Sequence, residues 1–319
     1  MASRVEKRSM ADKELQEIME RVKGKLVKSK AEIEAHEQGI TQTTDRIKKE
    51  ILKHTPEQEQ KIFSFLPTEM TRISPFFPLN KREMKDRPLE ELTWEHNWGR
   101  FTVTGKKLSV YDESVLLAVL VLMRKNQKET FQTTRHELCR VMNVTPCQDT
   151  YRAVWASLSR LTKTGIDLMI WSKKIKGKKR KVKKQMVNTI LSGAEMDENT
   201  GKIIITINPY FIRMYGESFI TNLDLKFRSQ LSGDITKALY RFLEGQREAA
   251  YQCHLLTLAK AINLNVEMET KLLRYRIRQG LRELKKQGYL IKWNVSKTDI
   301  IMTEKKKKNR NLKALPVKD

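Results

Sequence analysis

One row of side chains near the C-terminus has the residue types and spacing of a DNA-contacting helix. Arginine can bond the O6 and N7 atoms of guanine in the major groove, and lysine can neutralise phosphates. All but one of the candidates recur every three or four residues, so a helix would stack them along one face. A solvated surface helix is the alternative, although only Glu283 interrupts the basic residues here. The candidate set is Lys271, Arg274, Tyr275, Arg278, Arg282 and Lys285.

An apolar stripe runs along the opposite side of this segment, so we expect an amphipathic helix packed on a core. The stripe consists of Leu273, Ile277, Leu281 and Leu284. A second helix is expected at 149–164, again with apolar residues on one side. Residues at its N-terminal end and on its polar faces are candidates for base and phosphate contacts. They are Gln148, Thr150, Tyr151, Arg152, Arg160 and Lys163.

The densest charge lies at 173–184, which reads KKIKGKKRKVKK and contains nine basic residues among twelve. The apolar segments 166–172 and 185–196 flank this run, and each is predicted to be a strand. We therefore expect the run at the tip of a hairpin, as a wing that grips the DNA backbone. A nuclear-import signal fits the composition equally well but does not account for the flanking strands. The basic residues are Lys173, Lys174, Lys176, Lys178, Lys179, Arg180, Lys181, Lys183 and Lys184.

The sequence offers little that indicates catalysis, a cofactor or a metal. It has no GxxxxGK[ST] loop for nucleotide phosphates. It also lacks two histidines flanking one apolar residue, which a metal-dependent nicking enzyme would be expected to show. Cys139, Cys147 and Cys253 lack the paired spacing of a zinc site, and their odd number fits a reducing cytoplasm. We expect a cytoplasmic protein that works by binding.

The charge balance favours nucleic acid as the partner. The formal net charge is +25 over 319 residues. Residues 151–190 hold twelve basic residues and one acidic residue, and residues 271–292 hold eight and one. The longest apolar run, Val115–Met123, is too short to cross a bilayer, and no secretory signal is evident. The charge itself favours nucleic acid or an anionic membrane surface, and of these two we expect DNA.

The elements that would position these residues recur about 120 residues apart, which indicates an internal repeat of a whole domain. Each copy is predicted to contain three helices followed by a strand, a turn and a strand, the order of a winged helix. In each copy the third helix ends in glycine and the next strand ends in tryptophan. The matched pairs include Val115 with Ile235, Leu138 with Leu258, Leu158 with Leu281, Gly165 with Gly288 and Trp171 with Trp293.

The predicted fold class is α+β, with two tandem winged-helix domains and a helical or partly disordered N-terminal arm. For the arm, a marginal helix and a stable coiled coil both remain open, because apolar residues recur every seven positions but their companions are polar. The predicted divisions are 1–60 for the charged arm, 61–93 for an irregular connector containing proline, 94–222 for the first winged helix, 223–304 for the second and 305–319 for a basic tail.

Three local features are also expected. Residues 100–110 alternate in polarity and predict a hairpin that turns at Thr104-Gly105. Asp112 is a plausible N-cap for an apolar helix at 112–125. The stretch QKIFSFLP, 60–67, either binds a sliding clamp as a peptide or anchors the arm on the first domain.

Three stretches, TVTGKKLSVYDESVLLAVL, TFQTTRHELCRVMN and YRAVWASLSRLTKTGIDL, resemble the TrfA-like family of plasmid replication initiators. The likeness covers about residues 95–295. It implies two winged-helix domains that bind repeated sites, called iterons, in double-stranded DNA at a plasmid origin. It also implies melting of A·T-rich DNA and recruitment of the host replicative helicase and host initiator, without nucleotide hydrolysis. Related initiators repress their own promoters as dimers, so a homodimer is a further implied form.

A winged-helix transcriptional repressor is the alternative function. A repressor would usually add a ligand-binding or dimerisation domain and would recognise a palindromic operator. Here the two predicted DNA-binding copies fill the folded region and leave no room for a sensor domain. This organisation favours the initiator.

Overall fold

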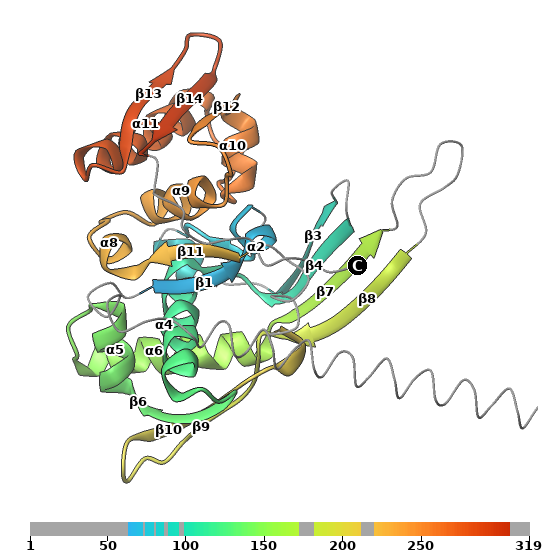
Figure 1. The fold of residues 1–319 in the computed structure, drawn as a ribbon, viewed down its shortest axis with the longest axis vertical. Coiled ribbons are helices and arrows are strands. Elements are labelled where there is room, and N and C mark those ends of the chain that lie inside the picture. Colours follow the sequence, from blue (N-terminus) through green and yellow to red (C-terminus); the bar gives the residue numbers. More distant parts are fainter. Residues whose placement is uncertain are drawn as a thin grey trace, which may run out of the picture. The chain divides into compact units, whose positions relative to one another are not determined.

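Figure 1 shows the computed structural model of the chain. The structure describes residues 63–72, 74–79, 81–85, 89–95, 99–171, 182–211 and 220–306. The predicted N-terminal arm, the centre of the basic run and nearly all of the predicted basic tail lie outside these residues. Helices and strands are mixed along the chain, which confirms an α+β fold. Among the described residues, no helix is long and apolar enough to cross a membrane.

The first helical unit lies in the middle of the chain. Its three strands form one antiparallel sheet in the order β6-β10-β9. The helices pack on one another through apolar side chains such as Leu116, Leu138 and Leu158, all fully buried. Its elements are α4 (Val110–Asn126), β6 (Thr130–Thr134), α5 (Arg135–Met142), α6 (Gln148–Lys163), β9 (Leu191–Met196) and β10 (Lys202–Ile207).

The N-terminus of α4 differs from the prediction by three residues. Ser109, not Asp112, is the N-cap, and its hydroxyl accepts a hydrogen bond from the Asp112 backbone N–H. Asp112 takes the third helical position and accepts a bond of 2.6 Å from the Ser109 backbone N–H. The two residues form a capping box, in which each side chain satisfies a backbone donor of the other. An aspartate can fill either position, so residue type alone did not distinguish them.

A second helical unit repeats the order of elements. Its three strands form an antiparallel sheet in the order β12-β14-β13, with the strand between the first two helices again at one edge. The core contains Leu239, Leu258, Leu281 and Leu284, which are buried. Its elements are α9 (Asp234–Glu244), β12 (Ala250–His254), α10 (Leu255–Ala261), α11 (Thr270–Lys286), β13 (Leu290–Val295) and β14 (Ile300–Lys305).

A separate four-stranded sheet combines two strands that precede α4 with two strands inserted between α6 and β9. It has the order β3-β4-β7-β8, with antiparallel pairing throughout. Figure 1 shows β7 and β8 side by side as long strands, with β7 next to β4. The strands are β3 (Leu89–Glu95), β4 (Gly99–Lys106), β7 (Gly165–Trp171) and β8 (Val182–Thr189).

This sheet corrects two local predictions. No hairpin turns at Thr104-Gly105, because β4 runs through both residues and pairs with β3 and β7 on its two sides. Gly105 has a φ of 138°, which glycine adopts without the cost that a Cβ would bring. The strand expected at 185–196 is two strands, β8 and β9, separated by a bend at Ile190. These two strands belong to different sheets.

The connector expected to be irregular, 61–93, contains regular elements instead. β1 (Phe63–Pro67) pairs with β11 (Ile220–Asp224), and α2 (Thr68–Arg72) packs against α9. Ser64 donates a hydrogen bond of 3.0 Å to the Leu117 carbonyl, and Leu66 is completely buried. The remaining short elements are β2 (Phe76–Phe77), α3 (Lys81–Lys85), β5 (Leu108–Ser109) and α8 (Leu225–Ser229).

This placement bears on the expected clamp-binding peptide. Five residues of the candidate peptide, Phe63–Pro67, form β1 and pair with β11 along their whole length. The Phe65 ring lies 4.9 Å from the guanidinium of Arg124. The arm and residues 60–62 lie outside the described residues, so the clamp-binding and arm-anchoring interpretations both stay predictions.

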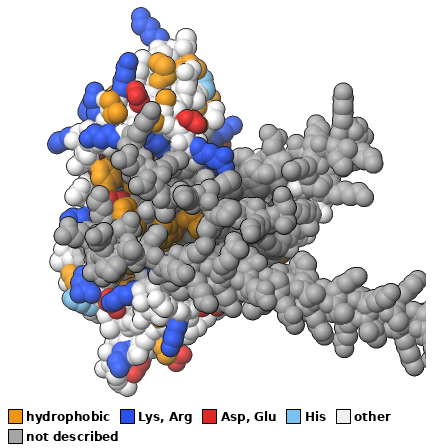
Figure 2. All heavy atoms as spheres, viewed as in Figure 1, with side chains coloured by type: hydrophobic (Ala, Val, Ile, Leu, Met, Phe, Trp, Pro, Cys, Tyr) orange, Lys and Arg blue, Asp and Glu red, His pale blue; other side chains and the backbone are white. Residues whose placement is uncertain are grey.

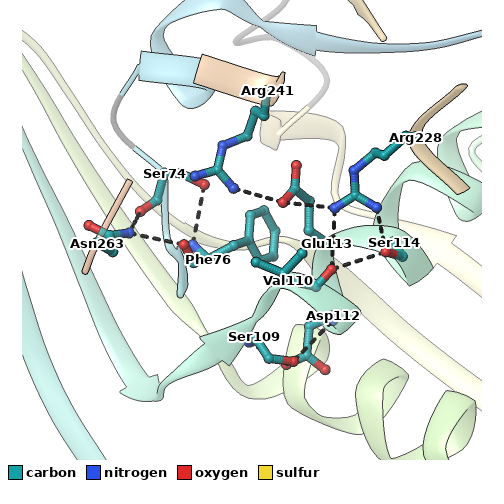
Figure 3. Close-up of polar contacts among 10 residues, drawn as sticks. All are labelled: Ser74, Phe76, Ser109, Val110, Asp112, Glu113, Ser114, Arg228, Arg241 and Asn263. Carbon is teal, nitrogen blue, oxygen red and sulfur yellow. Dashed lines mark hydrogen bonds and ion pairs between the residues drawn. The ribbon is translucent and has the colours of Figure 1, made fainter. Parts of the chain in front are cut away.

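Polar contacts join α4 to the elements of the second half (Figure 3). Arg228 of α8 donates hydrogen bonds to the Ser114 hydroxyl and the Val110 carbonyl. Asn263 donates from Nδ2 to the backbone carbonyls of Ser74 and Phe76, at 2.5 and 3.0 Å. These bonds tie the segment that follows α10 to the segment that precedes the first unit.

Candidate nucleic-acid interface

Helix α11 turns its apolar stripe inward as predicted. Leu273, Ile277, Leu281 and Leu284 are completely buried. Gly280 lies on the same side, where an added Cβ would come within 2.7 Å of Leu239 Cδ1 on α9. The absence of a side chain therefore lets α11 approach α9 closely. This packing fixes which side of α11 remains accessible.

The outward side of α11 carries polar and apolar side chains together. Tyr275 is 57% exposed and Leu272 is 40% exposed. The side-chain amide of Gln279 donates a hydrogen bond of 2.6 Å to the Tyr275 hydroxyl, one turn away. Four basic residues of the predicted set are also exposed, namely Lys271, Arg278, Arg282 and Lys285. Sequence reasoning missed Leu272 and Gln279, because it searched the helix for charge rather than for the residues opposite the apolar stripe.

Two arginines of the predicted set contact the β13–β14 hairpin. Arg274 donates to both carboxylate oxygens of Asp299, at 2.7 and 2.9 Å. Asp299 lies in the turn of the hairpin, and the hydrogen bond from Arg274 holds the pKa of this carboxyl below its ordinary value. Arg278 donates to the Val295 carbonyl at 3.1 Å. The sequence pattern predicted that both arginines contact DNA. In the structure their side chains instead bond the β13–β14 hairpin and connect it to α11.

The one acidic residue within the basic set, Glu283, has a structural role. Its carboxylate accepts hydrogen bonds from the Ser232 backbone N–H and hydroxyl and from the Thr236 hydroxyl, at 2.6 to 2.9 Å. Partial burial alone would raise the pKa of Glu283, but the bonds from Thr236 and Ser232 hold it below its ordinary value. Glu283 therefore binds the N-terminal end of α9, where a negative charge is favourable.

The N-terminal end of α6 is accessible. Gln148 and Arg152 are exposed, and Arg152 lies 3.5 Å from Asp149 in a largely exposed ion pair. The Thr150 hydroxyl lies 3.1 Å from the Cys147 thiol. The guanidinium of Arg135, from α5, lies 5.3 Å from the centre of the Tyr151 ring. The predicted candidates at this end are thus at the surface, with Tyr151 packed against a cation of the preceding helix.

Two other candidates on α6 differ from one another. Lys163 is exposed at the C-terminal end. Arg160 instead donates from Nη2 and Nε to Asp112, at 2.6 and 3.0 Å, and this carboxylate is completely buried. Burial alone would raise the pKa of Asp112, but the hydrogen bonds and charge of Arg160 outweigh it and lower the pKa. Arg160 therefore holds α6 on the first turn of α4, which the sequence pattern did not indicate.

The basic run has a different structural setting from the one predicted. Strands β7 and β8 flank it and pair with each other, but they belong to the four-stranded sheet. The hairpin of the three-stranded sheet is β9–β10, which turns at 197–201 and corresponds to β13–β14 of the second unit. Trp171 of β7 is therefore not equivalent to Trp293 of β13. Residues 173–181 lie outside the described residues, and Lys183 and Lys184 lie on β8.

The charge distribution is visible in Figure 2. Lys and Arg side chains gather over the upper part of the view, where Figure 1 places α11, β13 and β14. Across the described ranges there is no cluster of three or more potential metal ligands. The three cysteines are free thiols. The exposed side chains of α11 are cations, one hydroxyl, one amide, one tyrosine ring and the apolar Leu272.

The fold is similar to that of known structures at low sequence identity. Selenomethionine derivatives of domain 2 and domain 3 of RctB have a TM-score of 0.52 and 12% identity, covering 75% of this chain and 98% of that chain. A second structure of RctB domains 2-3 gives 0.51 and 12%, with coverage of 75% and 96%. The Pi initiator protein in complex with iteron DNA gives 0.47 and 10%, with coverage of 78% and 99%. These values describe likeness of fold.

Similarity in sequence bears on the protein family as well as on the fold. No curated protein matches the chain. Residues 92–244 match the family model Rep3_N, described as Initiator Replication protein, WH1. The match begins within β3, spans the first helical unit and continues through α9, the first helix of the second unit. It confirms the expected resemblance to replication initiators. Over residues 92–244 the chain is therefore similar to the winged-helix domain, WH1, of replication initiators.

Proposed function

We propose that this initiator binds direct repeats, or iterons, at a plasmid origin through two tandem winged-helix domains. The predicted divisions 94–222 and 223–304 serve as the two domains, with 1–60 as an arm, 61–93 as a connector and 305–319 as a tail. The observation that carries the proposal is the repeated order of helix, strand, helix, helix, strand and strand in the two units. In both units the third helix exposes polar and basic residues.

Two unequal reading helices on one chain would recognise a site without internal symmetry. Helix α6 presents glutamine, threonine and tyrosine at its N-terminal end, whereas α11 presents tyrosine, glutamine and several cations. Nothing would make the two halves of such a site alike. If the helices enter the major groove one helical turn apart, they span about 20 base pairs. Asymmetric sites are naturally arranged as direct repeats rather than as palindromes.

The helix residues proposed to contact DNA are chosen because their side chains lie at the surface. Arg274, Arg278 and Arg160, which have partners within the chain, act by holding α11, the β13–β14 hairpin and α6 in position. The basic residues of 173–184 contact DNA phosphates, a role that rests on their composition and on the β7–β8 strands that flank them. The helix residues that contact DNA are Gln148, Thr150, Tyr151, Arg152, Lys163, Lys271, Tyr275, Arg282 and Lys285.

Binding to several repeats would bend the DNA and favour melting of nearby A·T-rich steps, which unstack at low cost. The chain acts without a catalytic step or cofactor and passes the opened DNA to the host replicative helicase and host initiator. It acts in the cytoplasm, on plasmid DNA. A homodimer that represses its own promoter is a second form of the same protein.

Footprinting on the replicon that carries the gene tests this function. The purified full chain is incubated with origin DNA and competitor DNA at physiological salt, and a single-strand probe is then applied. We expect protection of several direct repeats and reactivity in an adjacent A·T-rich tract. Protection of one inverted repeat over a promoter, without a reactive tract, would contradict the proposal and indicate a repressor.

A further inference from the structure

The residues farthest from the apolar stripe of α11 are not its arginines. With Leu273, Ile277, Leu281 and Leu284 turned inward, the helical period places Tyr275 and Gln279 near the centre of the outward face. Arg274 and Arg278 lie to one side, next to the β13–β14 hairpin. A helix entering the major groove presents its central outward residues to base edges and its flanks to phosphates. The tyrosine and glutamine therefore occupy the position for reading bases.

The contact between these two side chains orients the amide. Gln279 Nε2 donates a hydrogen bond of 2.6 Å to the Tyr275 hydroxyl. An amide group has two N–H donors and one carbonyl acceptor, so this bond leaves one donor and the acceptor for a ligand. The remaining N–H donor and the carbonyl acceptor lie in the plane of the Gln279 amide. The hydrogen bond to Tyr275 restricts rotation of this amide plane. The pair therefore presents a fixed donor and acceptor at the surface of α11.

This pattern matches one base edge of the major groove. Adenine presents an N7 acceptor beside an N6 amino donor, and a glutamine amide can bond both at once. Guanine presents two acceptors, O6 and N7, and is matched by arginine or lysine instead. We propose that Gln279, oriented by Tyr275, determines specificity for an adenine in the half-site read by α11. The inference rests on the proposed function, because it requires α11 to enter the major groove.

The test is selection of binding sites from a pool of random duplex DNA by the full chain. The wild-type protein is expected to select a consensus site that contains one specific adenine. Gln279→Ala should select a consensus without this adenine, and Tyr275→Phe should select it less strongly. Gln287→Ala is the matched control, since Gln287 is an exposed glutamine just beyond the end of α11. Its consensus should equal that of the wild type. Thermal melting of each variant confirms that the fold is kept.

A second measurement identifies the atom that is read. Replacing the selected adenine by 7-deazaadenine removes the N7 acceptor and should weaken wild-type binding about tenfold, the scale of a bidentate base contact. Binding by Gln279→Ala should not change with this replacement. The inference would be overturned if 7-deazaadenine weakened binding equally for the two proteins. It would also be overturned if Gln279→Ala selected the wild-type consensus, and in either case the proposed function would stand. Failure of the wild-type chain to select any sequence would instead overturn the proposed function.

Discussion

The Glu113 carboxylate lies 2.7 Å from Nη1 of Arg241, and both side chains are completely buried between α4 and α9. Arg228 of α8 approaches the same carboxylate oxygen to 3.1 Å (Figure 3). One buried anion thus binds two cations from the elements that follow the first helical unit. Loss of one member leaves charges without a partner in a place that water does not reach, which costs far more than loss of an exposed pair.

Substitution of Glu113 by glutamine should therefore destabilise the protein strongly. We expect the free energy of unfolding to fall by about 3 kcal/mol, because two arginines lose their buried counter-charge. Urea denaturation measures the change. Glu198→Gln, in the exposed turn after β9, is the control and should change stability by less than about 0.5 kcal/mol. Similar small effects for both variants would show that the network contributes little.

Gly245 provides a test of how α2 packs on the second unit. Gly245 follows α9, and an added Cβ would overlap the hydroxyl of the buried Thr71 and lie 3.0 Å from its Cβ. Gly245→Ala should lower the free energy of unfolding by about 2 kcal/mol, a usual cost of overpacking. Gly193→Ala, where nothing lies within 4 Å of the new Cβ, is the matched control. Unfolding curves that coincide for the two variants would contradict the packing of α2.

The Asp112–Arg160 pair predicts a pH dependence. The folded-state pKa of Asp112 is lowered, so its ionised form stabilises the fold above the unfolded-state pKa of about 3.9. This contribution is lost as the pH falls through the lower, folded-state value. The stability difference between wild type and Asp112→Asn should therefore shrink from about pH 5 downward. A difference that stays constant to about pH 2 would show that the pair does not titrate in this way.

The basic run is tested by the salt dependence of DNA binding. Replacing Lys178, Lys179, Arg180 and Lys181 by alanine should reduce the slope of log affinity against log salt by about 0.9 for each phosphate that the run neutralises. The control removes the same charge from the arm by replacing Lys23, Lys25, Lys28 and Lys30. Equal reductions in the two variants would mean that net charge, rather than the β7–β8 hairpin, governs the slope.

The sequence predicted most of what depends on local periodicity. The buried stripe of α11 follows from leucine and isoleucine at helical spacing. The repeated helices were also recognisable, because both copies require apolar residues at the same positions of their cores. Such features need no knowledge of which distant segments become neighbours.

The errors concern the choice of partners. Nothing local distinguishes β7, which joins β4 and β8, from β13, which joins β14, since both are apolar strands that follow a helix. The inserted hairpin was therefore taken for the wing of the first unit. Likewise, Arg160, Arg274 and Arg278 have the composition of DNA contacts, but each binds a group that comes from elsewhere in the chain. Only the folded arrangement supplies those partners.

The central claim, that two different helices on one chain read the two halves of one asymmetric site, has a direct test. Hydroxyl-radical footprints of the full chain on a single repeat are compared with those of Gln148→Ala/Arg152→Ala on α6 and Arg282→Ala/Lys285→Ala on α11. Each double variant should lose protection over a different half of the repeat and keep it over the other. Uniform loss across the repeat in both variants, or a symmetric footprint of the wild-type chain, would contradict the account.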